Sequence, residues 1–238
     1  MTTGGSFMQN QQPSTLKEIR VHGTQDFPCA FYQTGTRIKG NMVKHHWHEE
    51  VELLYFSGGE FCLEVNMERF NISEECFYVI NPGELHSISV EKNGGCVENA
   101  VVFHMDMLSS AYALDQIQTN LIQPVQNGSI QFPRCLRKNE PAFEPVRKSY
   151  EEIRNVFGGD SFRENYYDGE AVTDDITRQL FIKSALLRIL AVLSANNLFE
   201  VTEKNHDHRI ETIKTTLTYI QENYKEKIYI RDLAGLIG

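Results

Sequence analysis

Short apolar runs separated by turn residues dominate the first hundred residues. VELLYF, EFCLEV, CFYVI and VENAVVFHM are runs of this kind, and turn signals such as Gly58-Gly59 lie between them. Strands of this length, with no helical repeat between them, are typical of antiparallel barrels and sandwiches. The pattern predicts an antiparallel β-barrel over residues 18–106, preceded by a disordered leader at residues 1–17.

The pattern changes to three- and four-residue repeats after the barrel. The longest apolar segment, 173–199, has more hydrophobic positions than one helix face against a small barrel requires. We therefore predict a helical region over 107–203 whose longest helix packs against the barrel and against a second subunit. A helix that is simply buried is the alternative. The dimer contact is expected to include Leu180, Leu187 and Leu190.

Residues 204–238 show a separate helical pattern. One helical stripe consists of Ile210, Ile213, Leu217 and Ile220. After a polar connection, Leu233-Ala234 precede Gly235 with the spacing of the first helix of a helix-turn-helix. An ordinary helical hairpin that closes the domain is the alternative.

The net charge of −9 lies in the first 200 residues, because residues 201–238 contain six basic and six acidic side chains. An acidic surface repels nucleic-acid phosphates, so most of this chain is not expected to bind DNA. The five cysteines are scattered, which favours reduced thiols in the cytoplasm over a disulfide framework. The sequence has no apolar run long enough to cross a bilayer and no secretory signal, so no membrane contact is expected.

Histidine and glutamate crowd into the stretch 45-HHWHEEVELLYF-56. On one continuous strand, alternate side chains share a face, which would bring His46, His48 and Glu52 together and turn Trp47 away. The apolar residues that follow indicate that this face becomes buried. A polar cluster at the open end of a barrel with an apolar floor is typical of ligand sites.

The spacing in this stretch fits a known pattern. GNMVKHHWHEEVELLYFSGG reads G-x5-HxH-x3-E-x6-G, with His46, His48 and Glu52 at the key positions. It resembles the first motif of the cupin family at every position. The sequence NPGELH at 81–86 resembles the second motif in its Pro-Gly turn and in His86. It departs from that motif in two ways: Pro82 and Gly83 are adjacent, where the motif has one residue between them, and the final Asn of the motif is missing.

These residues leave three kinds of site open. His46, His48, Glu52 and His86 form a three-histidine, one-carboxylate set suited to Zn, Ni, Mn or Fe. The same groups could hydrogen-bond a polar organic effector such as a sugar, with Trp47 as a stacking platform. They could also form a polar network that binds nothing. No P-loop and no nucleophile elbow occurs in the sequence, so no catalytic residue is assigned.

The end of the chain carries a second resemblance. The segments 219-YIQENY-224 and 228-IYIRDLA-234 resemble the start of the DNA-binding unit in the AraC family of transcription regulators. The order of a cupin-like barrel, a helical region and this end segment is also similar to that family. The similarity extends over the chain after its leader.

The AraC resemblance implies an α+β fold: a cupin-like jelly-roll barrel, a helical dimerisation region and the first helices of a helix-turn-helix domain. It implies that the barrel senses a small-molecule effector, first of all a carbohydrate, and that the chain forms a homodimer. DNA binding is expected only through a missing C-terminal part, because no recognition helix follows Gly238. The alternative function is a metal-dependent cupin enzyme, of the dioxygenase or isomerase type, that uses the same histidines and Glu52.

Overall fold

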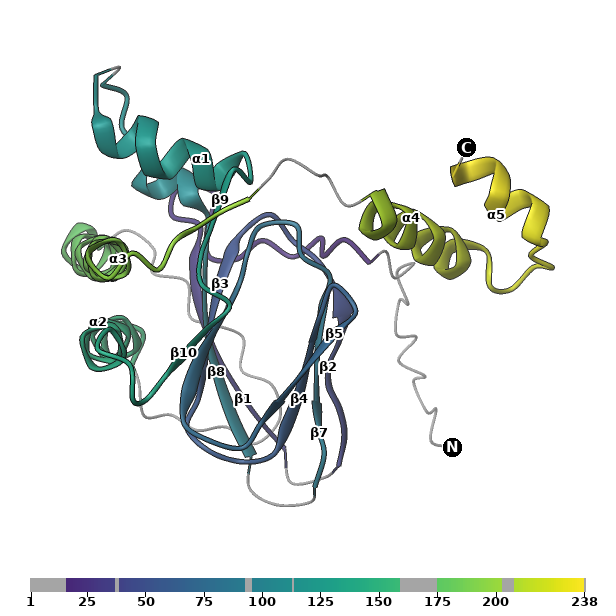
Figure 1. The fold of residues 1–238 in the computed structure, drawn as a ribbon, viewed down its shortest axis with the longest axis horizontal. Helices are drawn as coiled ribbons and strands as arrows, with labels where there is room; N and C mark the ends of the chain where they lie inside the picture. Colours follow the sequence, from purple (N-terminus) through teal and green to yellow (C-terminus); the bar gives the residue numbers. More distant parts are fainter. Residues whose placement is uncertain are drawn as a thin grey trace, which may run out of the picture.

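Two antiparallel sheets that face each other form the body of the protein (Figure 1). The computed structural model describes residues 16–36, 39–92, 96–112, 114–158, 175–202 and 208–237. Of the predicted leader, only Leu16 and Lys17 lie within these segments, and Leu16 is buried.

The strand order is β1-β8-β3-β6-β10 in the larger sheet and β2-β7-β4-β5 in the smaller one. The larger sheet consists of β1 (Cys29–Thr36), β8 (Cys96–Phe103), β3 (Val51–Phe56), β6 (Cys76–Ile80) and β10 (Cys135–Arg137). The smaller sheet consists of β2 (Gly40–His46), β7 (His86–Val90), β4 (Phe61–Val65) and β5 (Glu68–Ile72). Neighbouring strands in both sheets are antiparallel. This is a cupin-like jelly roll, and the predicted fold class is confirmed.

The alternation of side chains along β3 divides the core in two. Leu54 and Phe56 point between the two sheets and pack in the barrel interior. Val51 and Leu53 point the other way, into a second core that the helices cover. The larger sheet is therefore buried on both faces, which explains why the run VELLYF is almost continuously apolar. Each such side chain stabilises the fold by about 1.5–3 kcal/mol on burial.

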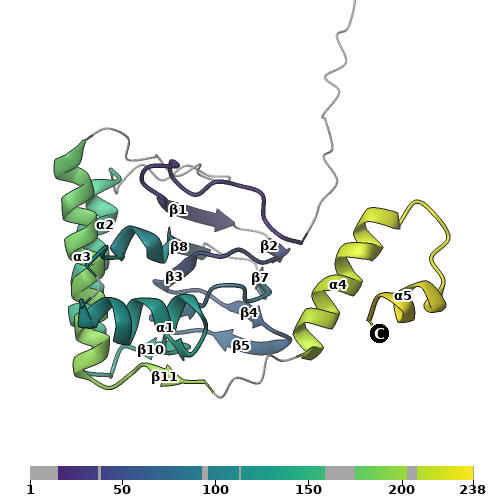
Figure 2. The same cartoon turned by 90° about the horizontal axis from the view of Figure 1, so that it is seen from above.

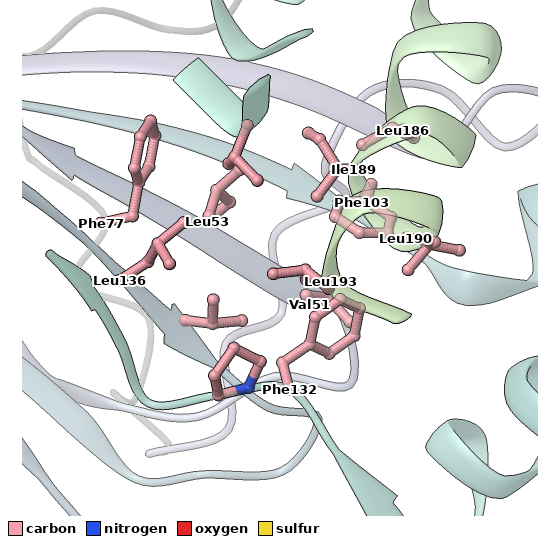
Figure 3. Close-up of a pocket in the computed structure, with 13 residues that line it drawn as sticks. Val51, Leu53, Phe77, Phe103, Phe132, Leu136, Leu186, Ile189, Leu190 and Leu193 are labelled. Atoms are coloured by element: carbon pink, nitrogen blue, oxygen red, sulfur yellow. The ribbon is translucent and has the colours of Figure 1, made fainter. Parts of the chain in front are cut away.

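Helices α2 (Phe143–Val156) and α3 (Ile176–Ala195) lie side by side over the outer face of the larger sheet (Figures 1 and 2). Between the sheet and α3, apolar side chains enclose a cavity of about 20 Å³. Leu53 and Phe77 line it from the sheet, and Leu186 and Leu190 line it from α3 (Figure 3). This volume has room for about one water but offers it no polar partner, so the cavity is a small packing defect.

Helix α3 has two apolar faces. Its core-facing side consists of Ile182, Ala185, Leu186, Ile189, Leu190 and Leu193. Its exposed apolar side chains are Ile176, Leu180, Phe181 and Leu187. The predicted packing against the barrel is therefore confirmed. Of the three leucines expected at a dimer contact, two are exposed, whereas Leu190 is only 3% exposed and belongs to the core. The contact with a second subunit stays a prediction.

The sequence pattern predicted that region 107–203 is helical throughout, and the structure shows that it is not. Besides β10, it contains two short strands that pair with each other, and its first helices are brief. These elements are η1 (Met105–Leu108), η2 (Gln118–Ile122), α1 (Gln123–Gln126), β9 (Ile130–Gln131) and β11 (Glu200–Val201). Strands of two or three residues are too short to produce a detectable alternation, which is why they were missed.

Helices α4 (His208–Asn223) and α5 (Ile230–Ile237) lie on the opposite side of the barrel from α2 and α3 (Figure 2). Both helices were predicted from the sequence. Nζ of Lys214 on α4 lies 4.6 Å from the ring centre of Trp47, so α4 contacts the barrel. Among the helices in the described segments, none is both long and apolar enough to cross a bilayer.

Candidate metal and ligand site

Three histidines and a glutamate converge at one end of the barrel, here called the barrel mouth. His46 ends β2 and pairs directly with His86, the first residue of β7. His48 lies between β2 and β3, and Glu52 is the second residue of β3. The ring centroids of His46 and His86 are 4.2 Å apart, and those of His48 and His86 are 5.1 Å apart. The fold thus brings together four of the five residues predicted for the site.

The chain reaches this arrangement through a corner, so the prediction of one continuous strand is wrong. β2 ends at His46 and β3 begins at Val51, and residues 47–50 cross from the smaller sheet to the larger one. His45 points away from the cluster and pairs with Glu64 at 3.0 Å. The predicted convergence is correct because the corner brings His48 back toward the barrel interior.

Each of the three histidines donates its Nδ1–H to a backbone carbonyl. The carbonyl acceptors are Lys44 for His46 (2.9 Å), Glu50 for His48 (3.2 Å) and Glu84 for His86 (2.9 Å). Because a carbonyl oxygen only accepts, the proton of each neutral ring must lie on Nδ1. The three Nε2 atoms therefore present lone pairs to the cluster, as metal-binding histidines do.

Glu52 lies beside two of these nitrogens. Its Oε2 is 3.0 Å from Nε2 of His86 and 3.4 Å from Nε2 of His48. Lone pairs of neutral rings would face those of the carboxylate, so a positive charge must lie between them, either a ring proton or a cation. Burial opposes the ionisation of Glu52, but His48 and His86 hold its pKa well below its usual range.

The histidines differ in their affinity for a proton. Burial and the neighbouring His86 lower the pKa of His46 to about 4, so this ring is neutral near pH 7. Burial also acts to lower the pKa of His48, but the adjacent Glu52 carboxylate outweighs it and raises this pKa. Without a cation, the Glu52 carboxylate therefore favours a proton on the ring of His48 more than on that of His46.

The donor set fits a divalent cation. Nε2 of His86 is buried and has no hydrogen-bond partner among the described residues. The ligand atoms of His46, His48 and His86 lie within 4.8 Å of one another. Neighbouring donors around an ion with bonds of ~2.1 Å lie about 3.0–3.4 Å apart, which matches the distances from Glu52 to His86 and His48.

Two side chains that precede the barrel join the cluster. Oε2 of Glu18 lies 3.3 Å from Nε2 of His46 and 3.5 Å from Nε2 of His22. His22 is 4% exposed, and its Nδ1 lies 2.7 Å from the Tyr32 hydroxyl. The sequence analysis missed both residues. Their local spacing, an acid four positions before a histidine, was the only available signal.

The turn that carries His86 is held by an ion pair between the buried Glu84 and the partly buried Arg134. The N–H of Glu84 donates to the carbonyl of Asn81 at 3.1 Å, and Gly83 between them has φ +79°. Arg134 binds both carboxylate oxygens of Glu84. The Glu84 carboxylate also accepts from the Asn81 N–H at 2.8 Å. Since the Glu84 carbonyl accepts from the ring of His86, the ion pair between Glu84 and Arg134 positions the site. Arg134 was not predicted because it lies 50 positions from Glu84 in the sequence.

Trp47 occupies a different environment from the four clustered residues. Its ring centre lies 4.9 Å from Nζ of Lys17 and 4.6 Å from Nζ of Lys214 on α4. These cation–π contacts place it where the chain before the barrel, the corner and α4 meet. Its predicted role in effector binding stays a prediction.

A buried carboxyl lies deeper in the barrel. Glu98 on β8 is 2% exposed and pairs across the sheet with Phe56, so it faces the barrel interior. Its Oε1 has no hydrogen-bond partner among the described residues. Burial, reinforced by the charge of Glu52, raises the pKa of Glu98 well above its usual range. Burial therefore favours the neutral form of the Glu98 carboxyl.

Comparison with known proteins assigns the family. The family model of the AraC-like ligand binding domain matches residues 33–155, just over half of the chain. The chain belongs to the AraC-like ligand-binding domain family. The matched residues of this AraC-like domain include β2 to β8, the four clustered side chains and α2 except for its last residue, Val156.

Several known proteins are similar to this AraC-like domain. The uncharacterized HTH-type transcriptional regulator YdeC of Bacillus subtilis (strain 168) is 25% identical over 227 residues, which cover 92% of this chain and 69% of YdeC. Apo ToxT of Vibrio cholerae, a crystal structure, has a TM-score of 0.43 and 10% identity over 90% of this chain and 71% of its own. A predicted oxalate decarboxylase of Thermotoga maritima has a TM-score of 0.29 and 24% identity over 31% of this chain and 64% of its own.

Proposed function

We propose that this AraC-like domain is the effector-sensing and dimerising part of an AraC-type transcription regulator that acts in the cytoplasm. The observation that carries the proposal is the cluster of three Nδ1-anchored histidines at the barrel mouth, two of which face Glu52. The similarity to YdeC, which is named as an HTH-type regulator and aligns with 92% of this chain, supports regulation.

The proposed sensor site contains a divalent cation bound by His46, His48, Glu52 and His86. When bound, the cation would supply the positive charge that the four lone-pair donors require, and it would attract the oxygen atoms of an effector. The effector is therefore expected to be a polar, oxygen-rich small molecule, and a carbohydrate is the first candidate. Trp47 is proposed as a further effector contact, through stacking on a sugar ring.

Metal titration tests the cation. The chain, purified without added metal, is titrated with Zn²⁺, Ni²⁺, Mn²⁺ and Fe²⁺, and bound metal is measured by elemental analysis. We expect one ion per chain, lost in the double variant His46→Ala/His48→Ala. His45→Ala is the matched control, because His45 lies on the same strand but pairs with Glu64. Equal metal binding by the double variant would refute the assignment of these ligands.

Thermal unfolding with a panel of sugars, with and without the metal, tests the effector. A ligand at 100 times its Kd stabilises the folded state by about 2.7 kcal/mol. The stabilisation should disappear in the double variant and persist in His45→Ala. A sugar that stabilises all three proteins equally would have to bind elsewhere.

The proposed output combines dimerisation and DNA binding. The exposed leucines of α3 are proposed to join two subunits, and α4 and α5 are proposed as the first helices of the DNA-binding unit. An effector that favours one arrangement of the dimer would change the spacing of the two DNA-binding units. Shifting such an equilibrium across most of its range requires about 5 kcal/mol of differential affinity.

A cupin enzyme remains a second candidate, because the four donors also match a catalytic metal site. The two functions differ in what happens to a bound molecule. A sensor releases its effector unchanged, whereas a dioxygenase or isomerase converts it. Mass spectrometry of each stabilising sugar after incubation with the metal-loaded chain therefore separates them, and a converted product would favour the enzyme.

A further inference from the structure

We propose that Glu18 is a fifth ligand of the cation at the barrel mouth, so that the cation fastens the chain before the barrel to the barrel itself. The segment concerned, residues 16–22, is called the N-terminal segment below. The inference rests on the cation site of the proposed function and extends it to a residue outside the cupin motif.

One short distance brings Glu18 beside a ligand of the proposed cation site. Its Oε2 lies 3.3 Å from Nε2 of His46, which is within the spacing of about 3.0–3.4 Å expected for neighbouring donors on one ion. The Nδ1–H of His46 donates to the Lys44 carbonyl, so the atom that faces Glu18 is a bare lone pair. A carboxylate oxygen and a bare imidazole nitrogen this close repel each other unless a positive charge, a ring proton or a cation, lies between them.

The backbone holds Glu18 in this position. The N–H of Glu18 donates to the carbonyl of Trp47, and the N–H of Trp47 donates to the carbonyl of Leu16, both at 2.9 Å. Neighbouring side chains of an extended segment point in opposite directions. Lys17 accordingly points away from the cluster and pairs with Glu49 at 2.5 Å, while Glu18 points into it.

His22 supports the same assignment. It is 4% exposed, and its Nε2 has no hydrogen-bond partner among the described residues although Glu18 is 3.5 Å away. The ligand atoms of Glu18, His22 and His48 lie within 4.8 Å of one another. A proton on this nitrogen would point toward the Glu18 carboxylate and hold it beside His46. We assign His22 as a positioning residue for Glu18.

Cobalt titration of the 238-residue chain tests the inference, because Co²⁺ reports its coordination through its visible spectrum. The variants are Glu18→Gln and, as a matched control, Glu49→Gln. Both remove one negative charge from the same region, but Glu49 is 60% exposed and pairs with Lys17. Glu18→Asp retains the charge on a shorter side chain and covers the case in which Glu18→Gln fails to fold.

We expect Glu18→Gln to lower the affinity for Co²⁺ at least about 10-fold. Its visible absorption should become more intense, because the coordination number falls. Bound Co²⁺ should slow amide hydrogen exchange in the N-terminal segment of the wild type and of Glu49→Gln, but not of Glu18→Gln. Glu18→Asp should lie between the two in affinity and protection.

Two results would overturn the inference in distinguishable ways. If the wild type binds no Co²⁺, both the proposed cation site and the role of Glu18 are wrong. If Glu18→Gln and Glu18→Asp bind Co²⁺ with the affinity, spectrum and protection of the wild type, only the role of Glu18 is wrong. The four-ligand site of the proposed function then stands.

Discussion

Single atoms decide what the barrel mouth can bind. A ring whose Nδ1–H is held by a carbonyl can offer only Nε2, and three such rings lie at the mouth, two of them facing Glu52. The same logic applies deeper in the barrel, where Glu98 has a carboxyl oxygen without a partner among the described residues. At the mouth, positive charge can satisfy the polar atoms. At Glu98, burial leaves the neutral acid as the stable form.

The first prediction concerns the pH dependence that Glu98 produces. Its pKa is higher in the folded chain than in the unfolded one, so the unfolded state binds fewer protons above the usual carboxyl pKa of about 4.3. The wild type therefore loses up to about 1.4 kcal/mol of stability per pH unit from there toward the folded pKa. Glu98→Gln should remove this loss and unfold at a higher temperature than wild type at pH 8.

The control is Glu68→Gln, which neutralises an exposed carboxylate at the start of β5. Denaturation curves from about pH 4 to pH 8 should show that the advantage of Glu98→Gln grows with pH and that Glu68→Gln has no such trend. A constant difference between Glu98→Gln and the wild type would mean that Glu98 is not the buried acid described here.

The sequence could predict those site residues whose spacing is local. His46, His48 and Glu52 lie within seven consecutive residues of the sequence, and a Pro-Gly turn comes just before His86. Glu18 and His22 could not be found in this way, because they reach the cluster by docking a segment whose own pattern contains no regular repeat. Glu98 was hidden for another reason, since one acid in an apolar strand gives no indication of its depth.

At the scale of elements, one tight turn directs the N-terminal segment toward the barrel mouth. The N–H of Thr24 donates to the carbonyl of Phe27 at 3.1 Å, and the N–H of Cys29 donates to the same carbonyl at 2.8 Å. Gly23 enters this turn with φ +81°. A Cβ at Gly23 would lie 2.5 Å from the carbonyl oxygens of Phe27 and Cys29. Only glycine fits there, both in conformation and in space.

The second prediction compares Gly23→Ala with Gly128→Ala. Gly128 has φ +71°, but no neighbouring atom lies within 4 Å of the position that a Cβ would occupy, so alanine there meets only backbone strain of about 1–2 kcal/mol. Gly23→Ala adds overlap with two carbonyl oxygens, so it should lower the free energy of unfolding by clearly more. Urea denaturation of both variants measures the difference. Equal losses would show that the turn moves enough to relieve the overlap.

The same comparison links the turn to the site. If the turn directs Glu18 to the barrel mouth, Gly23→Ala should also weaken Co²⁺ binding, whereas Gly128→Ala should not.

The elements themselves were partly predictable from the sequence. The strands of the barrel follow from their apolar runs, but the two faces of α3 could not be separated from sequence, because both are apolar and Ile182 and Ile189 resemble the exposed positions.

At the scale of the whole molecule, the barrel lies between two helical parts (Figure 2). On one side, α3 covers the larger sheet and leaves Leu180 61% and Leu187 44% exposed. On the other, Lys214 of α4 contacts Trp47 beside the corner that carries His48. A signal at the barrel mouth is thus close to α4, whereas the proposed dimer face lies beyond the larger sheet. Binding at the mouth would have to act on α4 within a dimer that α3 is proposed to form.

The third prediction tests this division of roles on α3. Leu180→Glu/Leu187→Glu places two charges on the exposed face, and each lost apolar contact should cost about 1.5 kcal/mol or more of association, so dimer affinity should fall roughly 100-fold or more. Leu190→Ala is the control, because Leu190 is in the core, and this variant should lose about 2–5 kcal/mol of stability.

Analytical ultracentrifugation over a concentration series measures association, and urea unfolding at low concentration measures stability. A wild type that stays monomeric, or a double variant that dimerises as well as the wild type, would contradict the assignment of this face. Reduced association in Leu190→Ala at full stability would move the dimer contact to a different face of the helix.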